Sequence, residues 1–146
     1  NYSKMVGKLF STTSNVILKP INLKVMRSQI FVNLPIKDLP DAMAFYTAIG
    51  FTNNPNFTDE TAACMVYSEE IFVMLLTHDR FKSFIVKDLG DTTKTTSVIN
   101  SLSMESVAKM NETADNALKA GGTEPTPPKD YGFMQQRSFE DLDGNF

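Results

Sequence analysis

The sequence repeats one plan twice, and this repeat limits the folds that the chain can adopt. "YTAIGF" (46–51) and "ALKAGGT" (117–123) each end a predicted helix at glycine, about 70 residues apart. In each half a predicted strand precedes the helix, and an irregular segment with at least one further strand follows it. The repeat therefore predicts an α+β domain that arose by internal duplication.

The first half carries the clearest signals of secondary structure. Residues 29–36, "QIFVNLPI", alternate between an aliphatic set and a mixed set of side chains, which predicts a strand. Asp38 is a suitable N-cap for the helix that follows, and Gly50 is a natural stop for it. After this helix we expect a short irregular strand and then two strands joined by a tight turn, at 51–57, 61–68 and 71–78.

The second half predicts fewer strands. A strand is expected over 96–103, a helix over 106–120 and a Pro-rich loop over 124–130. A further strand and a closing turn are expected within 133–145. The turn sequence "DLDGN" normally joins two strands, and only Phe146 follows it, so we expect the final strand of this half to be missing from the chain. The sheet edge left open would favour aggregation or pairing with a partner.

Composition is that of an ordinary globular domain. The 146 residues suffice for one domain, and 42% are hydrophobic, which can support a core. A formal charge of −3 gives no electrostatic reason to expect nucleic acid, and no apolar run approaches the roughly 20 residues of a membrane helix. The single cysteine, Cys64, fits a reducing compartment. We therefore predict a cytoplasmic protein with neither a nucleic-acid nor a membrane partner.

The N-terminal residues differ in charge from the rest of the chain. Lysines and an arginine recur there, but no Asp or Glu precedes Asp38. We predict that residues 1–27 are a leader outside the fold, consisting of upstream or added sequence. A basic, Ser-rich and acid-poor start is also typical of a transit peptide, so the alternative is that residues 1–25 direct the protein to an organelle.

Four stretches of the chain carry a family resemblance: "IFVNLPIKDLPDAMAFYTAIGF", "TAACMVYSEEIFVMLLTHDRF", "ALKAGG" and "GFMQQRSFEDLDGN". They resemble the vicinal oxygen chelate superfamily, which includes glyoxalase I, fosfomycin and bleomycin resistance proteins, and extradiol dioxygenases. The nearest resemblance is to bacterial predicted lactoylglutathione lyases. It implies a glyoxalase-like domain over 28–146, with two βαβββ modules at about 28–90 and 91–146 that form a half-open sheet around a cavity. It also implies a homodimer.

The resemblance further implies a divalent metal, held by four ligands from the first and last strands of the two modules. The metal chelates vicinal oxygens of the substrate and acts as a Lewis acid. The corresponding positions fall at Phe31, at Leu75, between Val98 and Asn100, and beyond Phe146. None of the positions within the chain is His or Glu, so we predict no metal and no other cofactor. A divalent metal is the alternative.

Two strands of the first half offer candidates for binding a ligand. If the aliphatic face of the first strand packs on the helix, then Phe31 and Asn33 face the cavity. Phe31 can stack on a ligand there, and Asn33 can hydrogen-bond it. The family position at Leu75 places Val73, Leu75 and Thr77 on the cavity side by the same alternation. The alternative is that these side chains simply fill a collapsed cavity.

A late strand of the second half adds Gln135 and Arg137 to the candidates. Arg137 can pair with an anionic ligand such as a carboxylate or a phosphonate. The more conservative interpretation pairs it with Glu140 or Asp141 at the surface.

Three functions remain open from the sequence. The first is a protein that binds a small molecule in the cavity without the usual metal, in the manner of bleomycin resistance proteins. The second is a metal-dependent lyase or isomerase of the lactoylglutathione lyase type. The third is a degenerate domain whose role is dimeric interaction. The apolar residues at the ligand positions favour the first, and whether the protein is an enzyme stays open.

Overall fold

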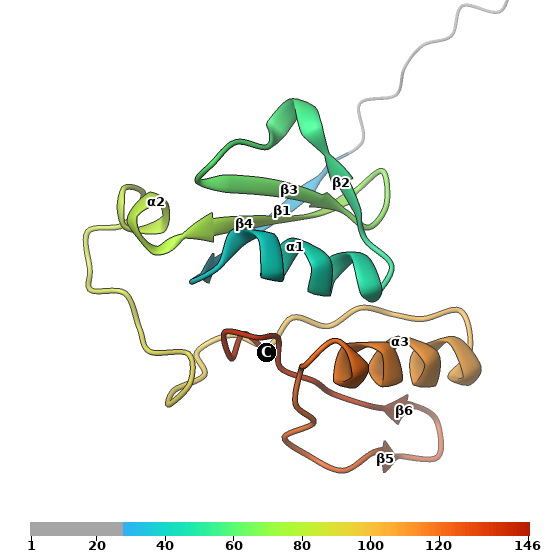
Figure 1. Ribbon diagram of the computed structural model, residues 1–146. Helices are drawn as coiled ribbons and strands as arrows, with labels where there is room; N and C mark the ends of the chain where they lie inside the picture. Colours follow the sequence, from blue (N-terminus) through green and yellow to red (C-terminus); the bar gives the residue numbers. More distant parts are fainter. Residues whose placement is uncertain (1–27) are drawn as a thin grey trace, which may run out of the picture.

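The computed structural model describes residues 28–146, and the leader predicted over 1–27 lies outside the described residues. The α+β class is confirmed: one four-stranded mixed sheet lies beside two main helices (Figure 1). The strand order in this sheet is β1-β4-β3-β2, where β1 and β4 run parallel and the other pairs antiparallel. In the described range, every helix is too short or too polar to cross a membrane.

The first module begins with β1 (Ile30–Ile36) and α1 (Leu39–Ala48), where the sequence predicts a strand and a helix. Asp38 caps the helix, because its Oδ1 accepts a hydrogen bond from the Asp41 N–H at 2.9 Å. The chain reverses at Gly50, whose φ of 103° lies in a region that glycine reaches without strain.

Three further strands complete a βαβββ module. β2 (Thr52–Asn54) runs into a 3₁₀ turn, η2 (Pro55–Phe57), and β3 (Ala62–Val66) forms a hairpin with β4 (Ile71–Thr77). The irregular strand and the hairpin predicted from the sequence are thereby confirmed.

A short helix that the sequence does not predict follows the hairpin. This helix, α2 (His78–Lys82), packs beside β1 and β4. His78 therefore opens a helix, whereas the sequence places it at the end of a strand.

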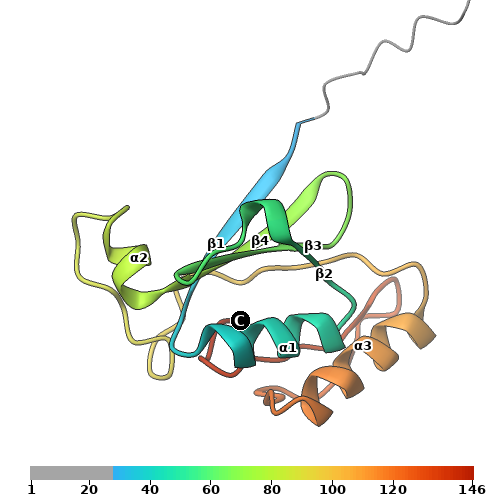
Figure 2. The same ribbon diagram turned by 45° about the horizontal axis from the view of Figure 1, so that its top comes forward.

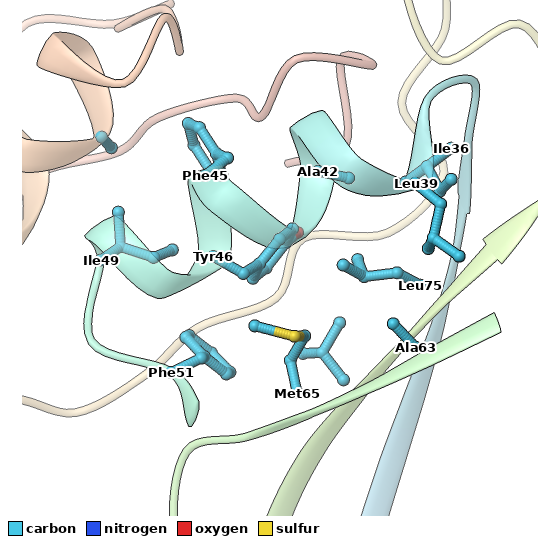
Figure 3. Packing of buried hydrophobic residues seen from close by; sticks show 12 residues of the cluster. Ile36, Leu39, Ala42, Phe45, Tyr46, Ile49, Phe51, Ala63, Met65 and Leu75 are labelled. Carbon is cyan, nitrogen blue, oxygen red and sulfur yellow. The ribbon is translucent and has the colours of Figure 1, made fainter. Parts of the chain in front are cut away.

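The hydrophobic core lies between α1 and the sheet (Figure 3). Phe45 from the helix and Met65 and Leu75 from the sheet are each at most 1% exposed. The rings of Tyr46 and Phe51 meet edge to face, with centroids 5.4 Å apart. Burial of each large side chain contributes about 1.5–3 kcal/mol, so this layer supplies much of the stability of the domain.

The second module keeps its helix but has little sheet. Helix α3 (Val107–Lys119) starts at its N-cap Ser106, whose Oγ accepts the Lys109 N–H at 3.1 Å. β5 (Lys129–Asp130) and β6 (Gln135–Gln136) form a two-stranded ribbon of two residues each.

The prediction of a strand over 96–103 is wrong. The segment is extended, and Figure 2 shows it running on the side of the sheet that carries α1. In the described part of the chain, its one backbone hydrogen bond joins the Asn100 N–H to the Phe146 carbonyl at 3.1 Å. Val98 and Ile99 are 63% and 62% exposed. A strand is stable when a neighbour pairs along its length, and this segment has no such neighbour within 28–146.

The closing turn of the second module fastens it to the first. Asp141 Oδ2 accepts the Tyr46 hydroxyl at 3.0 Å, and Asp141 Oδ1 accepts the N–H groups of Asp143 and Asn145, both at 2.9 Å. The Asn145 amide donates to the Pro35 carbonyl at 3.1 Å. These groups are buried and mutually hydrogen-bonded, so the turn holds α3 and its ribbon against α1.

Candidate binding cavity

A cavity of about 900 Å³ lies between the two modules. It borders the face of the sheet that carries α1, and its lining includes residues 99–104 of the extended chain that leads to α3. Most of its lining is apolar.

The first module supplies one wall through the pairing of β1 and β4. Val32 lies opposite Val73 and Ile30 opposite Ile71, so all four side chains leave the same face of the sheet. Ile49, the C-cap residue of α1, also lines the cavity. The result is an apolar surface of branched side chains held on a rigid sheet.

The second module supplies the opposite wall from three separate segments. Met110 comes from α3, Phe139 from the segment after β6, and Met104 from the extended segment. The Tyr67 hydroxyl lies 3.4 Å from the Met104 sulfur, which ties this segment to the hairpin of the first module. Methionine is flexible and polarisable, so this wall can adapt to the shape of a ligand.

Asn100, Gln135 and Gln136 are among the residues that bring side-chain amides to the lining. Asn100 lies in the extended segment, where its side-chain amide donates to the Phe146 carbonyl at 3.1 Å. Gln135 and Gln136 lie in β6 and are exposed. A ligand with one polar end could therefore be oriented in a mainly apolar space.

Arg137 lines the cavity next to Gln135 and Gln136, but its guanidinium is already hydrogen-bonded to two carboxylates. Nε and Nη2 donate to the two oxygens of Glu124 at 2.9 and 3.2 Å, and Nη1 donates to Asp115 Oδ1 at 2.7 Å. These hydrogen bonds, first to Glu124 and then to Asp115, raise the pKa of Arg137 above its usual value. The pairing expected with Glu140 or Asp141 is wrong, because those carboxylates accept hydrogen bonds elsewhere.

The structure brings three of the seven predicted ligand-binding residues to this cavity. Val73, Gln135 and Arg137 line it. Leu75 shares the face of Val73 but is fully buried in the core. Thr77, at the end of β4, is the N-cap residue of α2. Whether any of them binds a ligand stays a prediction.

Phe31 and Asn33 lie on the opposite face of the sheet. Phe31 stacks on Phe72 with ring centroids 4.6 Å apart, and the Asn33 amide donates to the Phe31 carbonyl at 3.1 Å. The expectation that Phe31 and Leu75 share a face is wrong, because Phe31 pairs with Phe72 while Leu75 pairs with Leu34. In a parallel pair, directly opposed residues point to the same side, so the two sets are separated by the sheet.

The sequence analysis does not identify most of the cavity wall. Val32 and Leu34 belong to the aliphatic face of the first strand, which the sequence predicts to pack on the helix; they do so, and they also line the cavity. The sequence predicts a strand in the extended segment and no ligand-binding residue there. Val98 and Ile99 are adjacent apolar residues, and this pattern does not say which of the two faces inward.

The described residues do not fit the metal site that the superfamily implies. Phe31 and Leu75 carry no donor atom and lie on opposite faces of the sheet. No group of three or more His, Cys, Asp or Glu side chains within 28–146 is placed to hold an ion, and residues 1–27 contain none of these types. Cys64 is buried, and burial raises the pKa of its thiol. No step through a metal is therefore derived for this chain.

Solved structures of other proteins share this fold. The hypothetical protein SA1046 from S. aureus is 24% identical with a TM-score of 0.68, and the match covers 82% of this chain and 90% of that one. A glyoxalase/bleomycin resistance protein/dioxygenase family enzyme from Burkholderia phytofirmans PsJN is 17% identical with a TM-score of 0.63, covering 82% and 94%. A glyoxalase/bleomycin resistance protein/dioxygenase from Nocardioides is 16% identical with a TM-score of 0.56, covering 84% and 83%.

Comparisons of sequence alone add no relative. No protein-family model matches the chain, and no curated protein matches it significantly. At these levels of identity, the structural matches establish the fold and leave the finer resemblance to lactoylglutathione lyases a prediction. The chain therefore has the fold of the glyoxalase/bleomycin resistance/dioxygenase superfamily, which is the vicinal oxygen chelate superfamily.

Proposed function

We propose that this protein binds a small apolar molecule in the cavity between its modules and does so without the metal of its superfamily. The observation that carries this proposal is the cavity itself, with its volume of about 900 Å³ and its mostly apolar lining. Sites for small molecules are typically mostly apolar and measure about 300–1,000 Å³. Both modules contribute walls, so a ligand would bridge them.

Ligand binding should stabilise the protein, because a ligand that binds only the folded state shifts the unfolding equilibrium. The test is a thermal-shift screen of uncharged aromatic and alicyclic compounds on the full chain, followed by calorimetric titration of the best hit. A ligand at 100 times its Kd should add about 2.7 kcal/mol of stability.

Two neighbouring residues provide a matched pair of variants for this screen. Ile99 lines the cavity and Val98 does not, although their exposed fractions are 62% and 63%. Ile99→Trp should weaken binding by placing an indole in the cavity, and Val98→Trp should leave it unchanged. Equal binding in both variants would locate the ligand outside this cavity.

The metal-dependent alternative is tested by native mass spectrometry after separate incubation with Zn²⁺, Ni²⁺, Mn²⁺ and Fe²⁺. Our proposal expects no ion retained, and one ion per protomer would overturn the metal-free part of it. The same spectra report the oligomeric state, for which we propose a homodimer. A dimer that binds no compound in the screen would instead support the interaction domain.

A further inference from the structure

We infer that the cavity selects an uncharged ligand and discriminates against anions, an inference that rests on the function proposed above. The first observation is the charge of the lining. Among the lining residues within 28–146, Arg137 has the one charged side chain. An ionised group entering an apolar space loses hydration, and this loss is costly unless the group is paired with an opposite charge and hydrogen-bonded.

The second observation is that Arg137 is not free to act as this partner. Its side chain is only 10% exposed, and its guanidinium donates to both oxygens of Glu124 and to Asp115. A fourth hydrogen bond, from Nη1, reaches the Asn111 carbonyl at 3.4 Å. Two carboxylates around one guanidinium leave a local charge of −1 (1 − 2), which repels an anion at this end.

The N-terminus of α3 is the other place where an anion could be attracted. Ser106 and Val107 line the cavity there, and a helix N-terminus presents unpaired N–H groups. The Ser106 hydroxyl already accepts the Lys109 N–H, and the Lys109 ammonium is paired with Glu112 at 2.9 Å. This end of the helix therefore offers an anion no free side-chain cation from these residues.

The remaining chemistry of the lining matches an uncharged molecule with a hydrogen-bonding end. Aliphatic, aromatic and methionine side chains from both modules accept an apolar body. The amides of Asn100, Gln135 and Gln136 can donate to or accept from a hydroxyl, a carbonyl or an amide. Aromatic alcohols, ketones and amides are thus the ligand class that the site fits.

Two fluorescent probes with one ring skeleton test the charge selection. N-phenyl-1-naphthylamine is uncharged, and 1-anilinonaphthalene-8-sulfonate adds a sulfonate to the same rings. We expect the Kd of the wild-type chain for the uncharged probe to be at least about tenfold lower than its Kd for the sulfonate probe. The reason is that the sulfonate would enter the site without a partner for its charge. Equal or tighter binding of the sulfonate would overturn the inference.

A double variant tests the cause of the selection. Asp115→Asn with Glu124→Gln keeps the shapes of both partners but releases the charge of Arg137. The Kd of the sulfonate should then fall about tenfold while that of the uncharged probe changes less than about twofold. An unchanged ratio of the two constants would show that Arg137 does not govern selection. Asp115 is 54% exposed, so the single variant Asp115→Asn should fold even if the double variant does not. Its Kd for the sulfonate should fall in the same direction, but by less.

The outcomes separate this inference from the proposed function. If neither probe binds the wild-type chain, both fail. If both probes bind, and Ile99→Trp weakens both while Val98→Trp does not, the cavity is the binding site. In that case, a lower Kd for the sulfonate than for the uncharged probe would contradict the charge selection but not the proposed binding function.

Discussion

The two modules follow one sequence plan but differ in how much of it becomes packed structure. In the first, four strands and α1 enclose a core in which Phe45, Met65 and Leu75 are at most 1% exposed. In the second, α3 forms, but apolar residues such as Val98, Ile99 and Phe133 stay 62–88% exposed. The difference shows that a helix is specified largely within its own residues, whereas a strand also needs partners along its length.

The second module is attached to the first through its buried turn. Across the module boundary, the Tyr46 hydroxyl donates to Asp141 and the Asn145 amide donates to the Pro35 carbonyl. The cavity lies beside this attachment and takes its walls from both sides. A well-packed half and a loosely packed half thus create a cavity with walls from both.

The largest expected difference between the modules is in amide hydrogen exchange. Amides of β3 and β4 lie in a ladder over the core, so they should exchange through global unfolding. Amides of 96–103 lack such a ladder and should exchange roughly a thousandfold faster or more. Mass spectrometry of peptides after timed labelling checks this. Similar protection in both regions would mean that the segment pairs with another chain in solution.

Two leucines, one in each module, allow the contribution of packing to stability to be compared between the modules. Leu75 is fully buried and Leu102 is 37% exposed. Leu75→Ala should lower the free energy of unfolding by about 2–5 kcal/mol, because it leaves a cavity in a packed core. Leu102→Ala should cost less than about 1 kcal/mol. Urea unfolding of both variants measures the difference, and comparable losses would contradict the loose packing of the second module.

The attachment between the modules can be broken at Tyr46. Tyr46→Phe removes the hydroxyl that donates to Asp141, and it should cost about 1.5–3 kcal/mol at pH 7, as for hydrogen bonds to charged groups. Burial, reinforced by Asp141 and Asp143, raises the pKa of Tyr46 well above its usual 10.0. The unfolded chain releases this proton near pH 10 while the folded chain keeps it, so wild-type stability falls above pH 10.

The phenylalanine variant lacks that proton and should show a shallower alkaline loss. The gap between the two proteins should therefore narrow as pH rises above 10, in unfolding curves recorded from pH 7 to pH 11. A gap that is constant across this range would mean that Tyr46 titrates alike in both states.

Much of the first module could be predicted from the sequence, because its signals are local. The alternation of side chains predicts β1, Asp38 predicts the start of α1, and Gly50 predicts its end. The register between β1 and β4 could not be predicted in this way. It pairs Phe31 with Phe72 across the sheet, and alternation within one strand does not say which face of a distant strand it matches.

The cavity was harder to predict than the fold, because its walls meet only after folding. Ile99, Met110 and Phe139 come from three segments of the second module, and no local pattern joins them. Arg137 was identified as a charged candidate. Its partners Glu124 and Asp115 could not be identified, since one lies in an irregular loop and the other on α3.

The smallest expected effect concerns Asp143 in the same turn. Burial raises the pKa of its carboxyl above the usual 3.8, although the Lys37 N–H donates to it at 3.0 Å. The folded state therefore holds this proton more tightly than the unfolded state. The stabilisation is complete below pH 3.8 and is lost as pH rises through the folded pKa.

Asp143→Asn keeps an oxygen for Lys37 and removes the buried charge. It should raise the free energy of unfolding by about 1 kcal/mol or less at pH 7 relative to wild type, and this gain should vanish near pH 3. Urea unfolding of both proteins at pH 3, 5 and 7 measures this dependence. A loss of stability in Asp143→Asn that grows from pH 3 to pH 7 would contradict this prediction, because it would show that the ionised carboxylate stabilises the fold.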